Sequence, residues 1–427
     1  MDSLFEPASI KQVTLGNRFV RAATWDGLGD PRGAVTDRMC DVVEALARGG
    51  VGLIITGHAF VLEEGRHSPG QIGAHDDGLL PGLERLASTA QRFHSRIALQ
   101  LGYGGAYLSR SRVAAMSVGQ LRRLAQGFGA AARRAHEAGF DAVEILAAHG
   151  FFLSQMLCPR YNPRTDEYGG ALVNRARALV ETLAAVRTAV GDDFPVLVKL
   201  NGRDGVENGL HLEESVAVAR MLENGGADAI EVSGGLLNVA NLLDARSESG
   251  EAYFETEAKA FKAAVNLPVI LTGGIRSLAT ASRLVAEGVA DFIAMCRPLI
   301  CEPGLVGRWS AGDTADARCV DCSRCVEAIK QGRGPVCEPV APVPLQTFFP
   351  QETILVPSGQ SPEQPTGYQM AIGLDQCQRA AGFVQVIRVQ PMEAGQPVGP
   401  GIAVPVANGQ ASAVLQALQE LLKRFGP

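Results

Sequence analysis

The sequence has 427 residues, of which 46% are apolar, so it can bury a large core and exceeds the length of one ordinary domain. Its net charge of -6 and pI near 5.7 supply no basic surface for a phosphate backbone, which excludes nucleic acid as an expected partner. The first residues lack the basic and apolar pattern of a secretory signal, and no apolar run approaches the roughly 20 residues that span a bilayer. We therefore expect a cytoplasmic protein with no membrane segment.

Short β-rich runs alternate with longer helical patterns from about residue 18 to residue 300, as in parallel strands joined by crossover helices. The expected strands are Phe19–Ala23, Val51–Thr56, Ile97–Leu101, Ala142–Leu146, Pro195–Leu200, Ala229–Val232, Val269–Thr272 and Phe292–Met295. The expected helices include Asp37–Arg48, Val118–Ala138, Val173–Val190, Leu212–Asn224, Glu255–Ala264 and Ser277–Glu287. The strands are apolar enough to be covered on both faces, which predicts an α/β fold of the (β/α)₈ TIM-barrel type. A doubly wound sheet is the alternative, but no Gly-x-Gly-x-x-Gly follows any strand, so a Rossmann domain is not supported.

The pattern changes after Trp309. A Cys-rich segment, 316–340, leads into the proline-rich run 339–344, which we interpret as a domain boundary. The remainder contains three strand-like runs and a closing amphipathic helix: Thr353–Val356, Val384–Val389, Gly401–Val406 and Ala411–Phe425. We expect a barrel over 1–315, the Cys-rich segment, and a small C-terminal α+β module over 341–427. The apolar face of its helix would cap the barrel or join another chain, a homo-oligomer included.

Glycine and arginine residues follow the last two expected strands. The seventh strand is followed by Thr272-Gly273-Gly274-Ile275-Arg276-Ser277, and the eighth by Cys296-Arg297-Pro298. Active sites of barrels lie on the loops after the strands, and glycine amides at a helix start with a nearby arginine can hold a phosphate dianion. A Gly-Gly turn by itself is more often only a tight loop, but its position here favours a phosphate site.

Several motifs together resemble one family of flavin enzymes. They are Gly16-Asn17-Arg18-Phe19, Arg21-Ala22-Ala23-Thr24, the segment from Gly139 to His149, Arg164-Thr165-Asp166-Glu167-Tyr168-Gly169-Gly170, and Asn174-Arg175. Over roughly residues 1 to 340 the sequence resembles the old yellow enzyme and 2,4-dienoyl-CoA reductase group of NADH:flavin oxidoreductases. The resemblance implies an FMN cofactor across the barrel mouth and NAD(P)H as co-substrate.

The resemblance also implies which residues bind FMN. It places Ala23, Thr24 and Gly57 under the flavin ring, Gln100 and Lys199 at its pyrimidine edge, and Gly273, Gly274, Cys296 and Arg297 at its phosphate. A lysine there would stabilise the anion that forms when hydride reaches the flavin. Without the resemblance, Lys199 would be interpreted as an ion-paired residue at a strand end and Gln100 as a hydrogen-bonded core amide.

Four positions depart from the family pattern, two of them being Tyr103, where histidine is usual, and Ala106, where arginine is usual. Leu146 stands where a substrate-binding histidine is usual, and Phe151 replaces the tyrosine that usually delivers a proton. Tyr103 is therefore a candidate replacement acid, with packing at the barrel mouth as the alternative. His149 is a candidate contact to a substrate carbonyl or carboxylate, with a structural bond to backbone as the alternative. His58, Arg66 and His67 lie on the loop after the second strand and are left unassigned.

Four cysteines are close together after the barrel. Cys319, Cys322 and Cys325 are each separated by two residues, and Cys337 follows after eleven more. This spacing suits four-cysteine zinc and [4Fe-4S] sites. The resemblance favours [4Fe-4S], although that branch of the family has three residues before the third cysteine. Zinc is the second interpretation and unliganded thiols the third.

The sequence thus predicts an oxidoreductase that uses NAD(P)H to reduce an activated, conjugated C=C bond or a related small molecule. The alternative is an FMN-binding protein without reductase activity, such as an isomerase, a tailoring enzyme or an inactive subunit, because Leu146 and Phe151 replace common catalytic groups.

Overall fold

The computed structural model describes residues 3–104, 112–236 and 250–337, together with the strand residues 352–356, 368–379, 382–393, 396–397 and 402–406. The chain divides into two compact units. The first contains Met1–Val320 and Cys325–Cys337, and the second contains Asp321–Arg324 and Glu338–Pro427.

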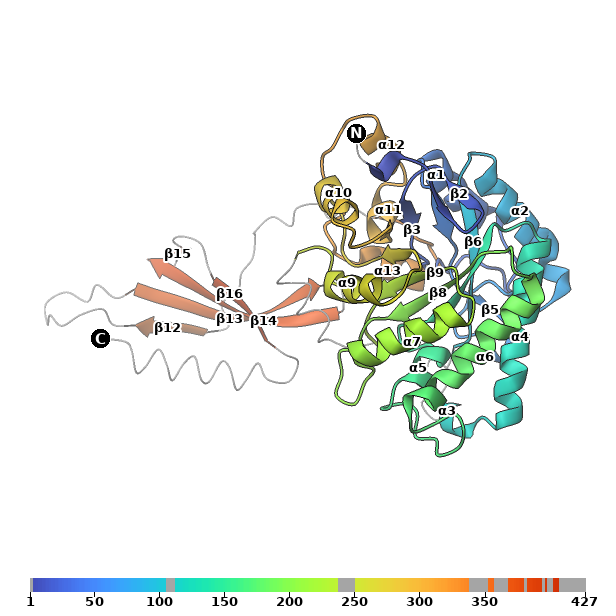
Figure 1. Cartoon of the computed structure of the whole chain (residues 1–427). Helices are drawn as coiled ribbons and strands as arrows, with labels where there is room; N and C mark the ends of the chain where they lie inside the picture. The colour runs from blue at the N-terminus through green and yellow to red at the C-terminus, as the bar shows by residue number, and fades with distance from the viewer. Residues whose placement is uncertain are drawn as a thin grey trace, which may run out of the picture. The chain divides into compact units, whose positions relative to one another are not determined.

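Parallel strands of the first unit form a closed barrel (Figure 1). In chain order they are β3 (Phe19–Arg21), β4 (Leu53–Ile55), β6 (Arg96–Gly102), β7 (Ala142–Ala147), β8 (Val196–Asn201), β9 (Ala229–Ser233), β10 (Val269–Leu271) and β11 (Phe292–Met295). Each pairs with its neighbour in sequence order, β4 pairs with β6, and β11 pairs with β3. All eight predicted strands are present, so the TIM-barrel prediction is confirmed and the doubly wound sheet is excluded.

Helices surround the barrel, as the predicted crossovers require (Figure 1). They include α1 (Asp37–Arg48), α2 (Leu80–Gln91), α4 (Val118–Glu137), α6 (Leu172–Val190), α7 (Leu212–Asn224), α9 (Glu255–Ala264) and α10 (Leu278–Ala286). The six predicted helices are confirmed to within about a residue at each end. The α4 helix starts with a capping box, in which Ser117 and Gln120 bond each other's backbone amides. The α2 helix, which was not predicted, has Pro81 in its first turn, where the missing amide costs nothing.

Shorter elements complete the first unit. They are η1 (Ser3–Phe5), β1 (Ala8–Ile10), β2 (Val13–Leu15), β5 (Ala59–Phe60), η2 (Glu63–Gly65), η3 (Asp77–Leu79), α3 (Arg112–Ala115), α5 (Phe152–Leu157), α11 (Arg297–Cys301), α12 (Leu305–Ser310) and α13 (Arg324–Lys330). The β1–β2 pair is an antiparallel hairpin, and β5 lies beside the end of β6. Within the described residues, no helix is long and apolar enough to cross a membrane.

The described residues of the second unit form an antiparallel sheet. Its strands are β12 (Glu352–Val356), β13 (Tyr368–Arg379), β14 (Gly382–Glu393), β15 (Gln396–Pro397) and β16 (Ile402–Val406). β13 and β14 are the long central pair, and β16 also pairs with β14. The three predicted strands correspond to β12, β14 and β16, whereas β13 was not predicted. The proline-rich run 339–344 and the predicted helix Ala411–Phe425 lie outside the described residues.

Candidate active site

The ends of β3 and β11 bring three predicted flavin-site residues together. The Arg21 guanidinium donates to Thr24 Oγ1 at 2.6 Å, and Thr24 Oγ1 lies 3.0 Å from Cys296 Sγ. Burial would raise the pKa of the Cys296 thiol, but the Arg21 charge and the bond to Thr24 outweigh it and lower the pKa. Gly57 lies against the same segment, because a Cβ there would be 2.6 Å from the Thr24 carbonyl oxygen. Close approach of two loops explains this glycine.

Gln100 and Lys199 belong to a row of polar side chains in the barrel interior. Gln100 Nε2 donates to Glu144 Oε2 at 2.6 Å, and Lys199 Nζ donates to Glu231 Oε1 at 2.7 Å. The four residues lie on the consecutive strands β6, β7, β8 and β9 and are at most 3% exposed. Burial alone would lower the pKa of Lys199, but the neighbouring acidic groups, Glu231 first, outweigh it and raise the pKa. The ammonium group therefore stays charged inside the barrel.

Glu144 and Glu231 also face each other. Glu144 Oε1 and Glu231 Oε2 are buried and have no hydrogen-bond partner among the described residues, although the two carboxyl groups are within hydrogen-bond reach. Two carboxylates cannot bond without a proton, and one shared proton satisfies both oxygens. Burial and the Glu231 charge raise the pKa of Glu144 well above its usual range, so we assign the proton to this pair. The sequence offered one signal for both residues, an acidic residue inside an apolar strand.

Both proposed catalytic side chains, Tyr103 and His149, are hydrogen-bonded to other residues of the protein. Tyr103 is 2% exposed, its ring packs against Phe152, and its hydroxyl accepts hydrogen bonds from the Arg112 guanidinium. These contacts support the packing interpretation of Tyr103. His149 has a φ of 60°, and its Nε2 lies 2.6 Å from Ser233 Oγ. That bond holds the His149 ring to the end of β9, which supports a structural role.

The unassigned histidines form a pair. His58 Nε2 and His67 Nε2 are 3.0 Å apart, and the rings of both pack against Phe151. The third unassigned residue, Arg66, donates to the carbonyl oxygens of Pro31 and Asp30, at 2.6 and 3.4 Å, and therefore does not join the pair. The sequence did not predict this contact, because it depends on how the loop after β4 folds back.

The turn between β10 and α10 has the backbone that the glycines permit. Gly273 and Gly274 have φ values of 127° and 73°, which residues other than glycine rarely adopt. A Cβ at Gly274 would lie 2.1 Å from Tyr253 Cζ, so the tyrosine ring covers this glycine. Within the described residues, the amides of Gly274 and Ile275 make no hydrogen bond. Backbone amides without hydrogen-bond partners at this turn can bind an anion.

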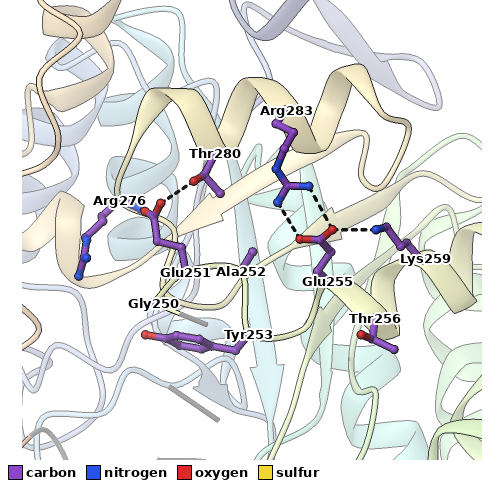
Figure 2. A pocket seen from close by; sticks show the side chains of 10 residues that line it. All are labelled: Gly250, Glu251, Ala252, Tyr253, Glu255, Thr256, Lys259, Arg276, Thr280 and Arg283. Atoms are coloured by element: carbon purple, nitrogen blue, oxygen red, sulfur yellow. Dashed lines mark hydrogen bonds and ion pairs between the residues drawn. The ribbon is translucent and has the colours of Figure 1, made fainter. Parts of the chain in front are cut away.

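A cavity of about 590 Å³ lies beside this turn (Figure 2). The Glu251 carboxylate lines it and caps α10, accepting from the Arg276 and Ser277 amides and from the Ser277 and Thr280 hydroxyls. Glu255 binds both Arg283 and Lys259, so those charges are neutralised (Figure 2). The Arg276 guanidinium has no acceptor within the described part of the chain.

Comparisons with known proteins identify this architecture. Residues 3–118 and 109–315 match the model of the NADH:flavin oxidoreductase / NADH oxidase family. The chain belongs to that family of oxidoreductases. This confirms the resemblance to the old yellow enzyme group.

Three relatives illustrate the range of the family. The chain is 30% identical to a 4,4'-dithiodibutanoate disulfide reductase of Rhodococcus erythropolis, over 77% of this chain and 94% of the relative. It is 30% identical to a multifunctional alkene reductase/demethylase OYE of Caballeronia cordobensis, over 76% of this chain and 51% of the relative. A solved 2-naphthoyl-CoA reductase superposes with a TM-score of 0.69 at 27% identity, over 74% of this chain and 53% of that one. The chain thus spans about half the length of the last two proteins.

The residues at the strand ends fit a flavin nucleotide. Lys199 is a buried cation in the same row of interior polar side chains as Gln100, and Gly274 and Ile275 present amides without partners at the predicted phosphate corner. Arg276 adds a guanidinium group that has no acceptor among the described residues. An anionic phosphate and a hydrogen-bonding ring edge would satisfy these groups.

The four predicted metal-ligand cysteines form no disulfide bonds among the described residues. Cys319, Cys325 and Cys337 belong to the first unit, whereas Cys322 belongs to the second. Among the described residues, no group of three or more His, Cys, Asp or Glu side chains could hold a metal ion. Cys301, which was not predicted, lies beside Cys337, and burial together with Cys337 raises the pKa of Cys301 to about 12. A metal role for the four cysteines stays a prediction.

Proposed function

We propose that this protein is an FMN-dependent oxidoreductase that uses NAD(P)H to reduce an activated, conjugated C=C bond of a small molecule. The observation that supports this most is the position of Lys199 on β8, where its buried ammonium group donates to Glu231 inside the barrel. Such a fixed cation stabilises negative charge that develops on a bound ring, and water cannot screen it there.

Each part of the site has a distinct task in this proposal. FMN, when bound, supplies hydride transfer from the nicotinamide to the substrate. Lys199 and Gln100 hold the pyrimidine edge, and the amides of Gly274 and Ile275 with Arg297 hold the phosphate. Ala23, Thr24 and Gly57 lie under the flavin ring in this proposal, and Gly273 and Cys296 belong to the phosphate site.

The test is the visible spectrum of the purified protein under anaerobic conditions, before and after addition of NADH or NADPH. We expect two flavin bands that bleach with the nucleotide and return when cyclohexenone is added. A colourless protein that cannot be reconstituted with FMN would overturn the proposal. The variant Lys199→Met is expected to bleach at least about tenfold more slowly, because the anionic ring loses its buried counter-charge.

The rival function is an FMN-binding protein without reductase activity. Leu146 and Phe151, which replace the usual polar groups, pack with Ala148 as a small apolar cluster. Bleaching by NAD(P)H without turnover of any enone would favour the rival. A specific relative suggests one further substrate class, since the disulfide reductase matches this chain over almost its own full length. Adding 4,4'-dithiodibutanoate to the bleached protein tests that class directly.

We also propose that the cysteine segment binds a [4Fe-4S] cluster, with structural zinc as the second choice and free thiols as the third. The spacing of Cys319, Cys322, Cys325 and Cys337 supports it. Iron, sulfide and zinc analysis of anaerobically purified protein tests it. About four irons per chain would support the cluster, and one zinc per chain would support the structural site. If neither metal is found, the four cysteines are reduced thiols.

A further inference from the structure

Strand pairing places the four polar side chains of the barrel interior in neighbouring positions. Gln100 on β6 is in register with Glu144 on β7, and the two side chains are hydrogen-bonded at 2.6 Å. Lys199 on β8 is in register with Glu231 on β9, and this pair is hydrogen-bonded at 2.7 Å. The exposed fraction is 3% for Lys199 and 0% for both glutamates. Water is therefore excluded, and the charges of this row act on one another at short range.

Each glutamate has one oxygen bonded to its neighbour and one oxygen without a partner. Glu144 Oε2 accepts from Gln100, and Glu231 Oε1 accepts from Lys199. Among the described residues, Glu144 Oε1 and Glu231 Oε2 are buried without a hydrogen-bond partner. The two carboxyl groups are within hydrogen-bond reach, so these oxygens together form a place for one proton.

Charged and titratable groups on several elements act on this proton. Burial and the charge of Glu231 raise the pKa of Glu144 well above its usual range, whereas the Lys199 ammonium opposes that shift. Cys296, which follows β11, acts electrostatically on Lys199. An additional negative charge beside Lys199 would raise the pKa of the glutamate pair further, because it repels the ionised pair and attracts the same cation.

We propose that the Glu144–Glu231 pair takes up a proton when the flavin site is reduced and thereby tunes the reduction potential of the bound flavin. This inference rests on the proposed function, which places the pyrimidine edge of the flavin at Lys199 and Gln100. Transfer of a hydride from NAD(P)H adds two electrons and one proton to the site, and therefore one negative charge. One proton from solvent, bound between Glu144 Oε1 and Glu231 Oε2, restores the net charge. The two glutamates act through Lys199 and are positioning residues.

Proton uptake by the pair depends on pH in a defined direction. Below the pKa of the pair in the oxidised protein, the proton is already bound, and reduction adds none there. Between that pKa and the higher pKa of the pair in the reduced protein, reduction adds one proton. Above both pKa values the pair stays ionised. The reduction potential therefore falls more steeply with pH inside this interval than on either side of it.

The first test is the midpoint potential of the FMN-loaded protein, measured against reference dyes from about pH 5 to about pH 10 with dithionite as reductant. We expect wild type to show an interval in which each two-electron reduction takes up one more proton than in Glu144→Gln, because the amide binds none. Glu84→Gln changes an exposed carboxylate on α2 and should reproduce the wild-type curve. An interval that survives in Glu144→Gln but disappears in Cys296→Ser would assign the proton to the thiol and overturn the proposal.

The second test observes the proton by infrared difference spectroscopy of the reduced protein minus the oxidised protein. Inside the interval, wild type should gain the C=O stretching band of a protonated carboxyl group, and this band should shift in ²H₂O. The band should be absent in Glu144→Gln and present in Glu84→Gln. A purely structural role of Glu144 would change the unfolding temperature but would leave no such band. If Glu144→Gln does not fold, the wild-type spectra still decide whether a carboxyl group takes up the proton.

Parallel potential curves of wild type and Glu144→Gln, or the lack of a carboxyl band on reduction at every pH, would overturn the role of the pair. Failure of the proposed function gives a different result. In that case NADH and NADPH do not bleach the FMN-loaded protein, or cyclohexenone does not restore its flavin bands. Dithionite reduces the bound flavin without these compounds, so both tests still decide the role of the two glutamates.

Discussion

In the barrel interior, the carboxyl groups of Glu144 and Glu231 lie near one ammonium group, that of Lys199. Three full charges there would be expensive to bury, and a shared proton reduces them to one ion pair. Lys199 then keeps Glu231 as its counter-ion, and neutral Glu144 accepts from Gln100. The net charge of the proposed flavin site therefore depends on one proton, which no sequence motif predicts.

This arrangement predicts a pH-dependent effect of Glu144→Gln. The folded protein raises the pKa of Glu144 above its ordinary value of 4.5. The contribution of the protonated Glu144 side chain to stability is therefore complete below pH 4.5 and is lost as the pH rises. The glutamine stays neutral, so the variant should become progressively more stable relative to wild type as the pH rises above 4.5. Thermal unfolding across this range measures it.

Two matched variants complete that experiment. Glu84→Gln changes an exposed carboxylate and should show no such trend. Glu231→Gln removes the partner of Lys199 and should destabilise the protein at every pH, by about 2 kcal/mol or more. A parallel response of Glu144→Gln and Glu84→Gln would contradict the shared proton.

Tyr103 gives a second prediction at the scale of one residue. Because its hydroxyl is buried against Arg112, Tyr103→Phe should lower the free energy of unfolding by about 1 kcal/mol. Turnover of an enone should stay within about twofold, with unchanged flavin content. A large loss of turnover at wild-type stability would restore Tyr103 as the proton donor.

At the scale of elements, the turn from β10 into α10 combines backbone strain with a close contact. Gly274→Ala adds a Cβ 2.1 Å from the Tyr253 ring at a φ of 73°. Gly288→Ala is the matched control, because its φ is 68° but no atom lies within 4 Å of the added Cβ. We expect a cost of about 1 kcal/mol at Gly288 and about 3 kcal/mol at Gly274.

The same pair of variants reports on the cofactor. Displacing Tyr253 disturbs the predicted phosphate corner, so only Gly274→Ala should release FMN during gel filtration. Equal flavin retention in both variants would show that this turn does not hold the phosphate.

The barrel elements were predictable because parallel strands buried on both faces appear as continuous apolar runs. The β13 strand was missed because glycine and polar residues interrupt its apolar residues, and α2 because the helical pattern between the second and third strands was not recognised. Site residues depend on contacts that no periodicity encodes. The His58–His67 bond depends on how one loop folds back on itself, and the Glu144–Glu231 pair joins two strands. The bond between His149 and Ser233 is likewise visible only in three dimensions.

At the scale of the whole molecule, the first unit has its own closed sheet and its own core. We therefore expect a chain of residues 1–337 to fold, bind FMN and keep the thermal stability of the barrel. Flavin content and the unfolding temperature, compared with the full chain, measure this. An insoluble or colourless product would mean that the barrel needs the residues that follow.

Closure of the barrel also constrains the order in which the protein can fold during synthesis. β3 contains Phe19–Arg21, and one of its two neighbours is β11, which contains Phe292–Met295. Until the ribosome has released β11, one edge of β3 has unpaired backbone groups and can pair with another nascent chain. A pause in translation shortly before residue 292 would prolong this aggregation-prone state, whereas a pause well after residue 295 would allow the barrel to close first.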